Sequence, residues 1–97
     1  MEKTIYLNDL YDYYKNLFTK RQQECYEDYY FNNLSLSEIA NNLEISRNAV
    51  YNQIKTVEKK VLFYEENLKM YERKKKVIKR IENLVDDKVL SSIEDIL

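Results

Sequence analysis

The sequence predicts an all-α protein: a helix-turn-helix bundle that lacks the wing of a winged helix, with a long heptad-patterned helix and a short C-terminal helix. Three observations support this fold class. The 97 residues include no glycine and no proline, so the residues that tight hairpin turns and strand bulges usually need are missing. Apolar side chains recur at steps of three and four, the spacing of one helix face. Serine and threonine stand where they can cap such helices.

A chain of 97 residues cannot divide its apolar surface between two independent cores, so we expect one structural unit. Within it, residues 1–56 are predicted to form a helical bundle with the helix-turn-helix at 35–55. Residues 57–97 are predicted to add the basic continuation of the long helix and the C-terminal helix.

The first two helices are predicted between residues 7 and 31. The apolar face of the first consists of Leu7, Leu10, Tyr11, Tyr14, Leu17 and Phe18. Thr19 and Gln22 then form the pattern of a capping box, which starts a second helix at about Lys20 and carries it to Phe31. Its apolar stripe consists of Cys25, Tyr26, Tyr29 and Tyr30, and Asn32-Asn33 supplies the stop.

The strongest local signal is a helix-turn-helix between Ser35 and Lys55. Ser35 and Glu38 match a capping box, and Leu34 stands where it can contact Ile39 across the first turn. After the turn, Ser46 can cap a further helix, with Ile45 placed to contact Val50. Ala40 allows close packing of two nearly perpendicular helices. An ordinary helical corner is the alternative. Glu44 stands where glycine is usual, and its left-handed conformation costs ~1 kcal/mol.

From Val50 onward the apolar positions alternate at four and three residues, which predicts one heptad seam that continues to Ile78. The seam consists of Val50, Ile54, Val57, Val61, Tyr64, Leu68 and Tyr71, followed by Lys75 and Ile78. Asp86-Asp87 is expected to start a last short helix. Its buried side is expected to consist of Val89, Leu90, Ile93, Ile96 and Leu97.

The second helix of the motif carries side chains suited to nucleic acid. With its apolar side in the core, the residues left outward are Arg47, Asn48, Tyr51, Asn52 and Lys55. Arginine can bond guanine edges, asparagine can bond adenine, and a lysine can hold a phosphate. These five residues are therefore the candidate nucleic-acid-binding site.

Charge is distributed unevenly along the chain. The formal net charge is -1, but residues 47–81 hold eleven Lys or Arg against four acidic residues, a local charge of +7. Candidate phosphate contacts in this region are Lys59, Lys74, Lys75 and Lys76. The basic run from Lys69 to Arg80 is equally well interpreted as a phosphate-binding stripe or as a solvated flank of a coiled coil.

Several classes of function lack their usual residues. The chain has no histidine, one cysteine and no glycine, so no imidazole base, thiolate cluster or phosphate-cradling loop is expected, and neither is a metal or a cofactor. Glu65-Glu66 and Asp86-Asp87 are interpreted as solvated surface, because adjacent helical residues point about 100° apart. The missing residue types predict a protein that is not an enzyme. No leader or long apolar run is seen, which predicts a cytoplasmic protein that does not insert into membranes.

The tyrosines could stack on unpaired bases, but most of them lie on apolar stripes. Tyr11, Tyr14, Tyr26, Tyr29 and Tyr30 are therefore predicted to be core residues. Tyr13 and Tyr51 are the better candidates for exposed rings.

Five segments resemble the YlxM family of small bacterial proteins, which are similar to the DNA-binding region four of sigma factors. They are L-F-T-K-R-Q (17–22), S-L-S-E-I-A (35–40), I-S-R-N-A-V-Y (45–51), I-K-T-V-E-K (54–59) and Y-E-E-N-L (64–68). The likeness covers about residues 5–72 in order. It implies a connection with the signal recognition particle, through the particle's RNA, its GTPase or the DNA of its operon. It also implies a homodimer, and it maps the family's presumed recognition positions to the same five residues, 47, 48, 51, 52 and 55.

Three functional hypotheses follow. The first is a nucleic-acid-binding accessory factor of the signal recognition particle pathway, with DNA or the particle's RNA as ligand. The second is a protein-interaction module that modulates the particle's GTPase. The third is a DNA-binding repressor of its operon, which would need two recognition helices about one duplex turn (~34 Å) apart in a dimer.

Overall fold

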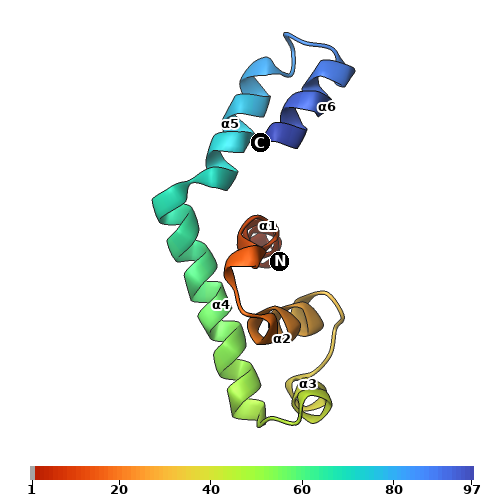
Figure 1. The fold of residues 1–97 in the computed structure, drawn as a ribbon, viewed down its shortest axis with the longest axis vertical. Helices are drawn as coiled ribbons and strands as arrows, with labels where there is room; N and C mark the ends of the chain where they lie inside the picture. Colours follow the sequence, from red (N-terminus) through yellow and green to blue (C-terminus); the bar gives the residue numbers. More distant parts are fainter. Residues whose placement is uncertain (1) are drawn as a thin grey trace.

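The computed structural model describes residues 2–97, which form six α-helices and one 3-10 turn and no β-strand (Figure 1). The elements are α1 (Glu2–Tyr14), η1 (Lys15–Leu17), α2 (Lys20–Tyr30), α3 (Leu36–Leu43), α4 (Arg47–Leu68), α5 (Met70–Ile81) and α6 (Asp87–Ile96). The described part measures 52 × 25 × 24 Å. The predicted all-α fold class is confirmed, including a long helix, α4, and a short C-terminal helix, α6.

The three preceding α-helices all pack against the long helix α4. In Figure 1, α1, α2 and α3 all lie along one side of it. A first buried cluster joins α1, α2 and α4 and consists of Leu7, Leu10, Tyr11, Tyr14, Phe18, Tyr26, Val57 and Val61. A second joins α2, α3 and α4 and consists of Cys25, Ile39, Ala40, Val50 and Ile54. Burial of each large apolar side chain in these clusters stabilises the fold by ~1.5–3 kcal/mol, so the two clusters hold α1 to α4 together.

Buried tyrosines occupy much of the first cluster. The rings of Tyr11 and Tyr26 stack with their centroids 4.2 Å apart. The hydroxyl of Tyr11 donates to Glu27 (2.6 Å) and that of Tyr26 to Asn8 (2.7 Å), so neither polar atom is left without a partner. Tyr11, Tyr14 and Tyr26 are thus core residues, as predicted.

Two of the tyrosine predictions are wrong. Tyr29 lies four residues after buried Cys25, yet its side chain is 39% exposed, because its ring packs edge-on against Tyr30 at the rim of the core. Tyr13 was expected to be exposed but is half-buried, since it packs against Tyr14 and Tyr71. The pattern of spacing gives the face of a helix, but it does not say where the neighbouring helix ends.

The helix starts follow the local signals in the sequence. Thr19 and Ser35 form complete capping boxes with Gln22 and Glu38, and the hydroxyl of Ser46 accepts from the Ala49 backbone N–H at 3.0 Å. Glu44 ends α3 in the left-handed region, with φ 56° and ψ 42°. Leu34, which precedes α3, and Ile45, which lies in the turn before α4, both pack against the second cluster. These contacts fix the start of each helix of the helix-turn-helix.

The expectation of one unbroken helix through Ile78 is wrong at Lys69. This residue adopts φ 54° and ψ 31°, so α4 ends at Leu68 and α5 starts at Met70. The Glu65 carboxylate, 7% exposed, accepts from the backbone N–H groups of Tyr71 (3.1 Å) and Glu72 (3.0 Å). The heptad phase continues past the break, and for this reason the apolar periodicity does not reveal it.

The interpretation of Glu65 as solvated surface is also wrong, although Glu66 is exposed as expected. Besides the two N–H groups, Glu65 accepts from the Tyr14 hydroxyl at 2.7 Å, and that hydroxyl accepts from the Met70 N–H at 3.1 Å. A buried carboxylate with three donors is well satisfied. We call Tyr14, Glu65 and the first turn of α5 the joint, because they fix where α5 leaves α4.

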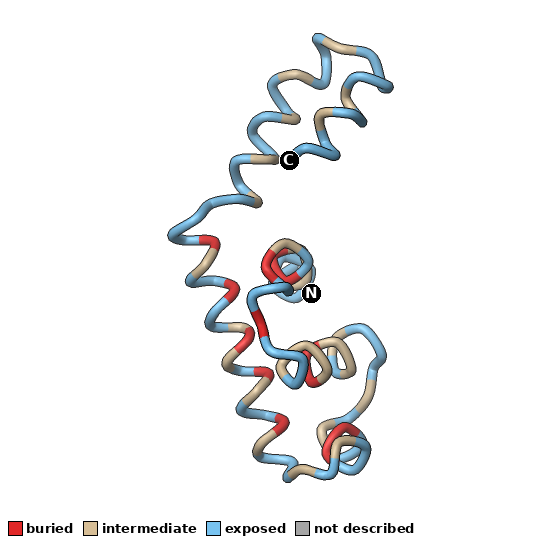
Figure 2. The backbone as a smooth tube through the Cα atoms, in the orientation of Figure 1, coloured by how far each residue is buried: buried red, intermediate tan, exposed pale blue. Residues whose placement is uncertain are grey.

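Helices α5 and α6 form a hairpin that extends beyond the rest of the molecule. Figure 2 shows red, buried segments along α1 to α4 but none in α5 or α6. Asp86 caps α6 as predicted, its carboxylate accepting from the Val89 N–H at 2.8 Å. The predicted buried side of α6 is wrong, because Leu90 and Ile93 are only half-buried and Val89, Ile96 and Leu97 are exposed. A two-helix hairpin packed mainly on itself has no third layer to cover it.

Candidate nucleic-acid interface

The candidate interface is the outer face of the first two turns of α4, and the core fixes its orientation. Val50, Ile54 and Val57 are all buried against α1, α2 and α3. A helix packed along one face cannot rotate about its axis, so the residues on its opposite face must point into solvent. Because the N-cap of Ser46 sets where α4 begins, it also sets where the first outward residues stand.

All five predicted recognition residues have exposed side chains. They are Arg47, Asn48, Tyr51, Asn52 and Lys55. Their spacing of one, three, one and three places them in two adjoining rows over two turns of the helix. The structure therefore brings them together on one surface, where a guanidinium, two amides, a phenol and an ammonium can meet a ligand at the same time.

Lys55 is already engaged within the chain. Its Nζ lies 3.2 Å from Glu58 Oε1 and 5.5 Å from the centroid of the Tyr51 ring. The hydrogen bond to Glu58 raises the pKa of Lys55 above its ordinary value, so the ammonium stays charged. An exposed pair of this kind contributes only ~0–1 kcal/mol, so a phosphate can displace Glu58 at little cost.

The predicted phosphate contacts fall into two separate places. Lys59 is exposed on α4, whereas Lys74, Lys75 and Lys76 lie on α5, beyond the break at Lys69. Lys74 lies over the Tyr13 ring (5.6 Å), Lys75 over the Tyr71 ring (5.1 Å) and Lys76 is paired with Glu72 (3.0 Å). These four lysines do not form one stripe with the recognition face.

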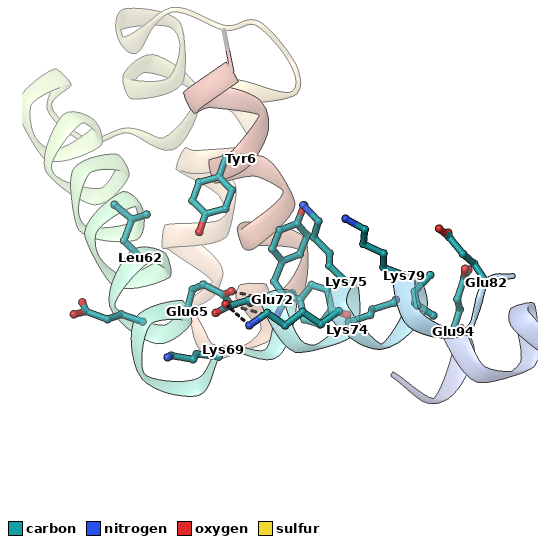
Figure 3. A pocket seen from close by; sticks show the side chains of 15 residues that line it. Tyr6, Leu62, Glu65, Lys69, Glu72, Lys74, Lys75, Lys79, Glu82 and Glu94 are labelled. Carbon is teal, nitrogen blue, oxygen red and sulfur yellow. Dashed lines mark hydrogen bonds and ion pairs between the residues drawn. The ribbon is translucent and has the colours of Figure 1, made fainter. Parts of the chain in front are cut away.

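The lysines of α5 line an open groove of about 1030 Å³ between α1, the end of α4 and the hairpin (Figure 3). Its walls include the apolar or aromatic side chains of Tyr6, Tyr13, Leu62, Tyr71 and Ile78. Five lysines and five glutamates also line it, so the groove carries no excess of positive charge. A phosphate backbone would gain little there, because electrostatic affinity depends on net neutralisation by cations.

Sequence reasoning missed a second feature beside the recognition face. Tyr29 of α2 and Tyr51 of α4 line a small cavity of about 100 Å³ that also involves Leu36 of α3. No sequence signal points to this cavity, because the spacing of Tyr29 assigns it to the core stripe. Only the packing of α2 against α3 and α4 shows that its ring reaches solvent.

Three further features of residues 2–97 concern metal ligands, the single cysteine and the hydropathy of the helices. Across residues 2–97 no group of three or more potential metal ligands is gathered. Burial raises the pKa of the Cys25 thiol, so it stays protonated within the second cluster. None of the helices between residues 2 and 97 has the length and apolar character needed to span a bilayer.

Comparison with known proteins gives a consistent result over nearly the whole chain. Residues 1–96 match the UPF0122 family, described as "Putative helix-turn-helix protein, YlxM / p13 like". A UPF0122 protein of Bacillus pumilus is 40% identical over 90 residues, covering 90% of this chain and 82% of the relative. One of Geobacillus kaustophilus is 40% identical over 88 residues, covering 88% and 80%. One of Fusobacterium nucleatum is 35% identical over 97 residues, covering 100% and 94%.

Proposed function

Because the chain belongs to the UPF0122 family of helix-turn-helix proteins, we propose that it binds nucleic acid through the outer face of α4, as an accessory or regulatory protein of the signal recognition particle pathway. The observation that carries the proposal is the joint exposure of Arg47, Asn48, Tyr51, Asn52 and Lys55 on a helix whose opposite face is locked in the core. The pathway itself rests on the resemblance to the YlxM family.

The proposed roles follow from side-chain chemistry. Arg47 is suited to a guanine edge, and Asn48 and Asn52 to adenine. Lys55 and Lys59 are the proposed phosphate contacts on α4, and they set register rather than sequence. Lys74, Lys75 and Lys76 stay weaker candidates, because each already contacts a tyrosine ring or a glutamate.

A homodimer is part of the proposal. The apolar side chains that line the groove form a surface that a second copy could cover. We propose that residues 1–56 and 57–97 act as one unit in it. Two recognition helices set about one duplex turn (~34 Å) apart would allow repression of an operon, whereas binding of the particle's RNA has no such requirement.

The second candidate function is a protein-interaction module that modulates the particle's GTPase. It is favoured by the same groove, because the groove is lined by three tyrosines, a residue type enriched at protein interfaces, and its balanced charge gives no net attraction to phosphate. In either case we propose a cytoplasmic protein without catalytic activity and without membrane insertion.

The test is fluorescence anisotropy of the purified protein against labelled particle RNA and upstream operon DNA, each over a salt series. We expect sub-micromolar binding whose affinity falls steeply with salt, and a loss of ~1–3 kcal/mol in Arg47→Ala. Lys88→Ala removes one positive charge from exposed α6 and is the matched control. Weak affinity for both nucleic acids, unchanged by Arg47→Ala, would refute this function and favour the protein-interaction module.

A further inference from the structure

The cavity beside the recognition face has two exposed aromatic rings in a lining that is partly apolar and partly charged. Tyr29 on α2 and Tyr51 on α4 are 39% and 45% exposed. The rest of the lining consists of half-buried Leu36, buried Ile54, Tyr30, Lys55 and Glu58. Exposed aromatic side chains beside a hollow of mixed polarity form a site where a flat ring can stack while its polar edge finds hydrogen-bond partners.

The two rings are held in position by neighbours in the chain. Tyr29 packs perpendicular to Tyr30, with centroids 5.1 Å apart and an interplanar angle of 90°, and the Tyr30 hydroxyl donates to Glu58. Lys55 bridges Glu58 and the face of the Tyr51 ring. A pre-positioned ring loses little side-chain entropy when a ligand stacks on it.

The cavity is also larger than a single water molecule. Its volume of about 100 Å³ is several times the ~15 Å³ that one water molecule requires. Tyr51 and Lys55 belong both to the cavity lining and to the row of exposed polar residues on α4. A ligand in the cavity would therefore be continuous with one on the recognition face.

We infer that this cavity takes one unpaired nucleobase, stacked against Tyr29 and Tyr51, from the strand whose phosphates meet Lys55. The inference deepens the proposed function and rests on it. Unpaired bases are recognised by aromatic stacking in both RNA and single-stranded DNA. Lys55 lines the cavity and is exposed, so its ammonium can meet the phosphate attached to a turned-out base.

The experiment compares two short RNA hairpins that differ only by one bulged 2-aminopurine, together with their DNA counterparts. We expect the protein to bind the bulged hairpin about five- to a hundredfold more tightly than the paired one, which corresponds to ~1–3 kcal/mol for stacking one base. The fluorescence of the bulged 2-aminopurine should fall on binding, as it does when this base stacks. A preference shared by RNA and DNA would assign the cavity to any unpaired base, and a preference confined to RNA would name RNA as its source.

Variants separate this inference from the function on which it rests. Tyr29→Ala should abolish the preference for the bulge and leave binding of the paired hairpin unchanged, whereas Tyr29→Phe should keep both, because it retains the ring. Phe31→Ala is the matched control, since Phe31 is 44% exposed, makes an edge contact with Tyr26 and lines neither the cavity nor the groove. Thermal unfolding of each variant checks that the fold is intact.

Equal affinity for the bulged and paired hairpins, or a preference that survives Tyr29→Ala, would overturn the inference. The proposed function would then stand, provided that Arg47→Ala weakens binding of both hairpins. If neither hairpin binds, the inference fails, and the proposed function is decided separately by its binding to the particle RNA and the operon DNA.

Discussion

The four N-terminal helices and the C-terminal hairpin are stabilised in different ways. The first region buries thirteen apolar or aromatic side chains in two clusters, whereas none of the residues that the structure describes in α5 or α6 is buried. The hairpin depends instead on the joint and on contacts of α5 with α1. The comparison shows that the same spacing of apolar residues can continue from a helix that packs in a core into a helix that buries no residue.

The largest expected effect comes from one substitution made in both regions. Ile39 is fully buried in α3, and Ile96 is 80% exposed in α6. Ile39→Ala should lower the free energy of unfolding by ~2–5 kcal/mol, because it leaves a cavity in a packed core. Ile96→Ala should change it by less than ~0.5 kcal/mol. Urea denaturation measures both, and a large loss for Ile96→Ala would mean that a second copy covers α6.

The next effect concerns the joint that connects the two regions. Glu65→Ala leaves the Tyr14 hydroxyl and the Tyr71 and Glu72 N–H groups without their acceptor, which should cost ~1–3 kcal/mol. Hydrogen exchange should show faster exchange of the α5 amides, while the core amides of α3 keep their protection. Glu66→Ala, at an exposed position, is the control. Equal exchange in α5 for the two variants would contradict the role of the joint.

The joint should also be sensitive to alkaline pH. Burial and the hydrogen bond to Glu65 raise the pKa of Tyr14 from 10.0 to about 12. A group whose pKa is raised on folding contributes stability that is fully present below its unfolded pKa, so this contribution should be lost between pH 10 and about 12. Urea denaturation across this range should show a shallower decline for Tyr14→Phe than for the unsubstituted chain. An unchanged slope would mean that Tyr14 ionises no differently in the folded and unfolded chains.

The smallest effect compares the left-handed residues in the two regions. Glu44 ends α3 at φ 56° and Lys69 ends α4 at φ 54°. Glycine relieves the strain of ~1–2 kcal/mol but enlarges the unfolded ensemble by ~0.4–1 kcal/mol, so Glu44→Gly should raise the unfolding free energy by about 0.5–1 kcal/mol. Lys69→Gly should raise the unfolding free energy measured in a global denaturation by less than this, because the hairpin beyond Lys69 can open locally. A gain for Lys69→Gly as large as that for Glu44→Gly would show that the two regions unfold together.

Features set by local chemistry could be predicted from the sequence. The capping boxes at Thr19 and Ser35, the N-cap at Ser46 and the left-handed turn at Glu44 each depend on a few neighbouring residues. The outward orientation of Arg47 and Asn48 followed because the apolar residues of the same helix were easily identified. Whether these side chains bind nucleic acid is the part that stays a prediction.

Features set by distant contacts could not be predicted. The break at Lys69 depends on Glu65 being buried beneath Tyr14, a residue 51 positions earlier in the chain. The exposure of Tyr29 depends on where α3 and α4 end relative to α2, and the exposure of α6 on the lack of a further helix to cover it within the described chain. The hydrophobic pattern of a sequence indicates which face of a helix would be buried, but it does not show whether another helix is there to cover that face.

The joint also has a consequence for the order in which the chain folds. Contacts within helices and between consecutive helices close short loops and form quickly, but the hydrogen bond from Tyr14 to Glu65 closes a loop of about 50 residues, which costs more entropy and forms later. During synthesis the Tyr14 hydroxyl emerges long before its acceptor. The direction in which the C-terminal hairpin leaves the molecule is therefore set by a late, long-range step, after α3 has packed on the start of α4.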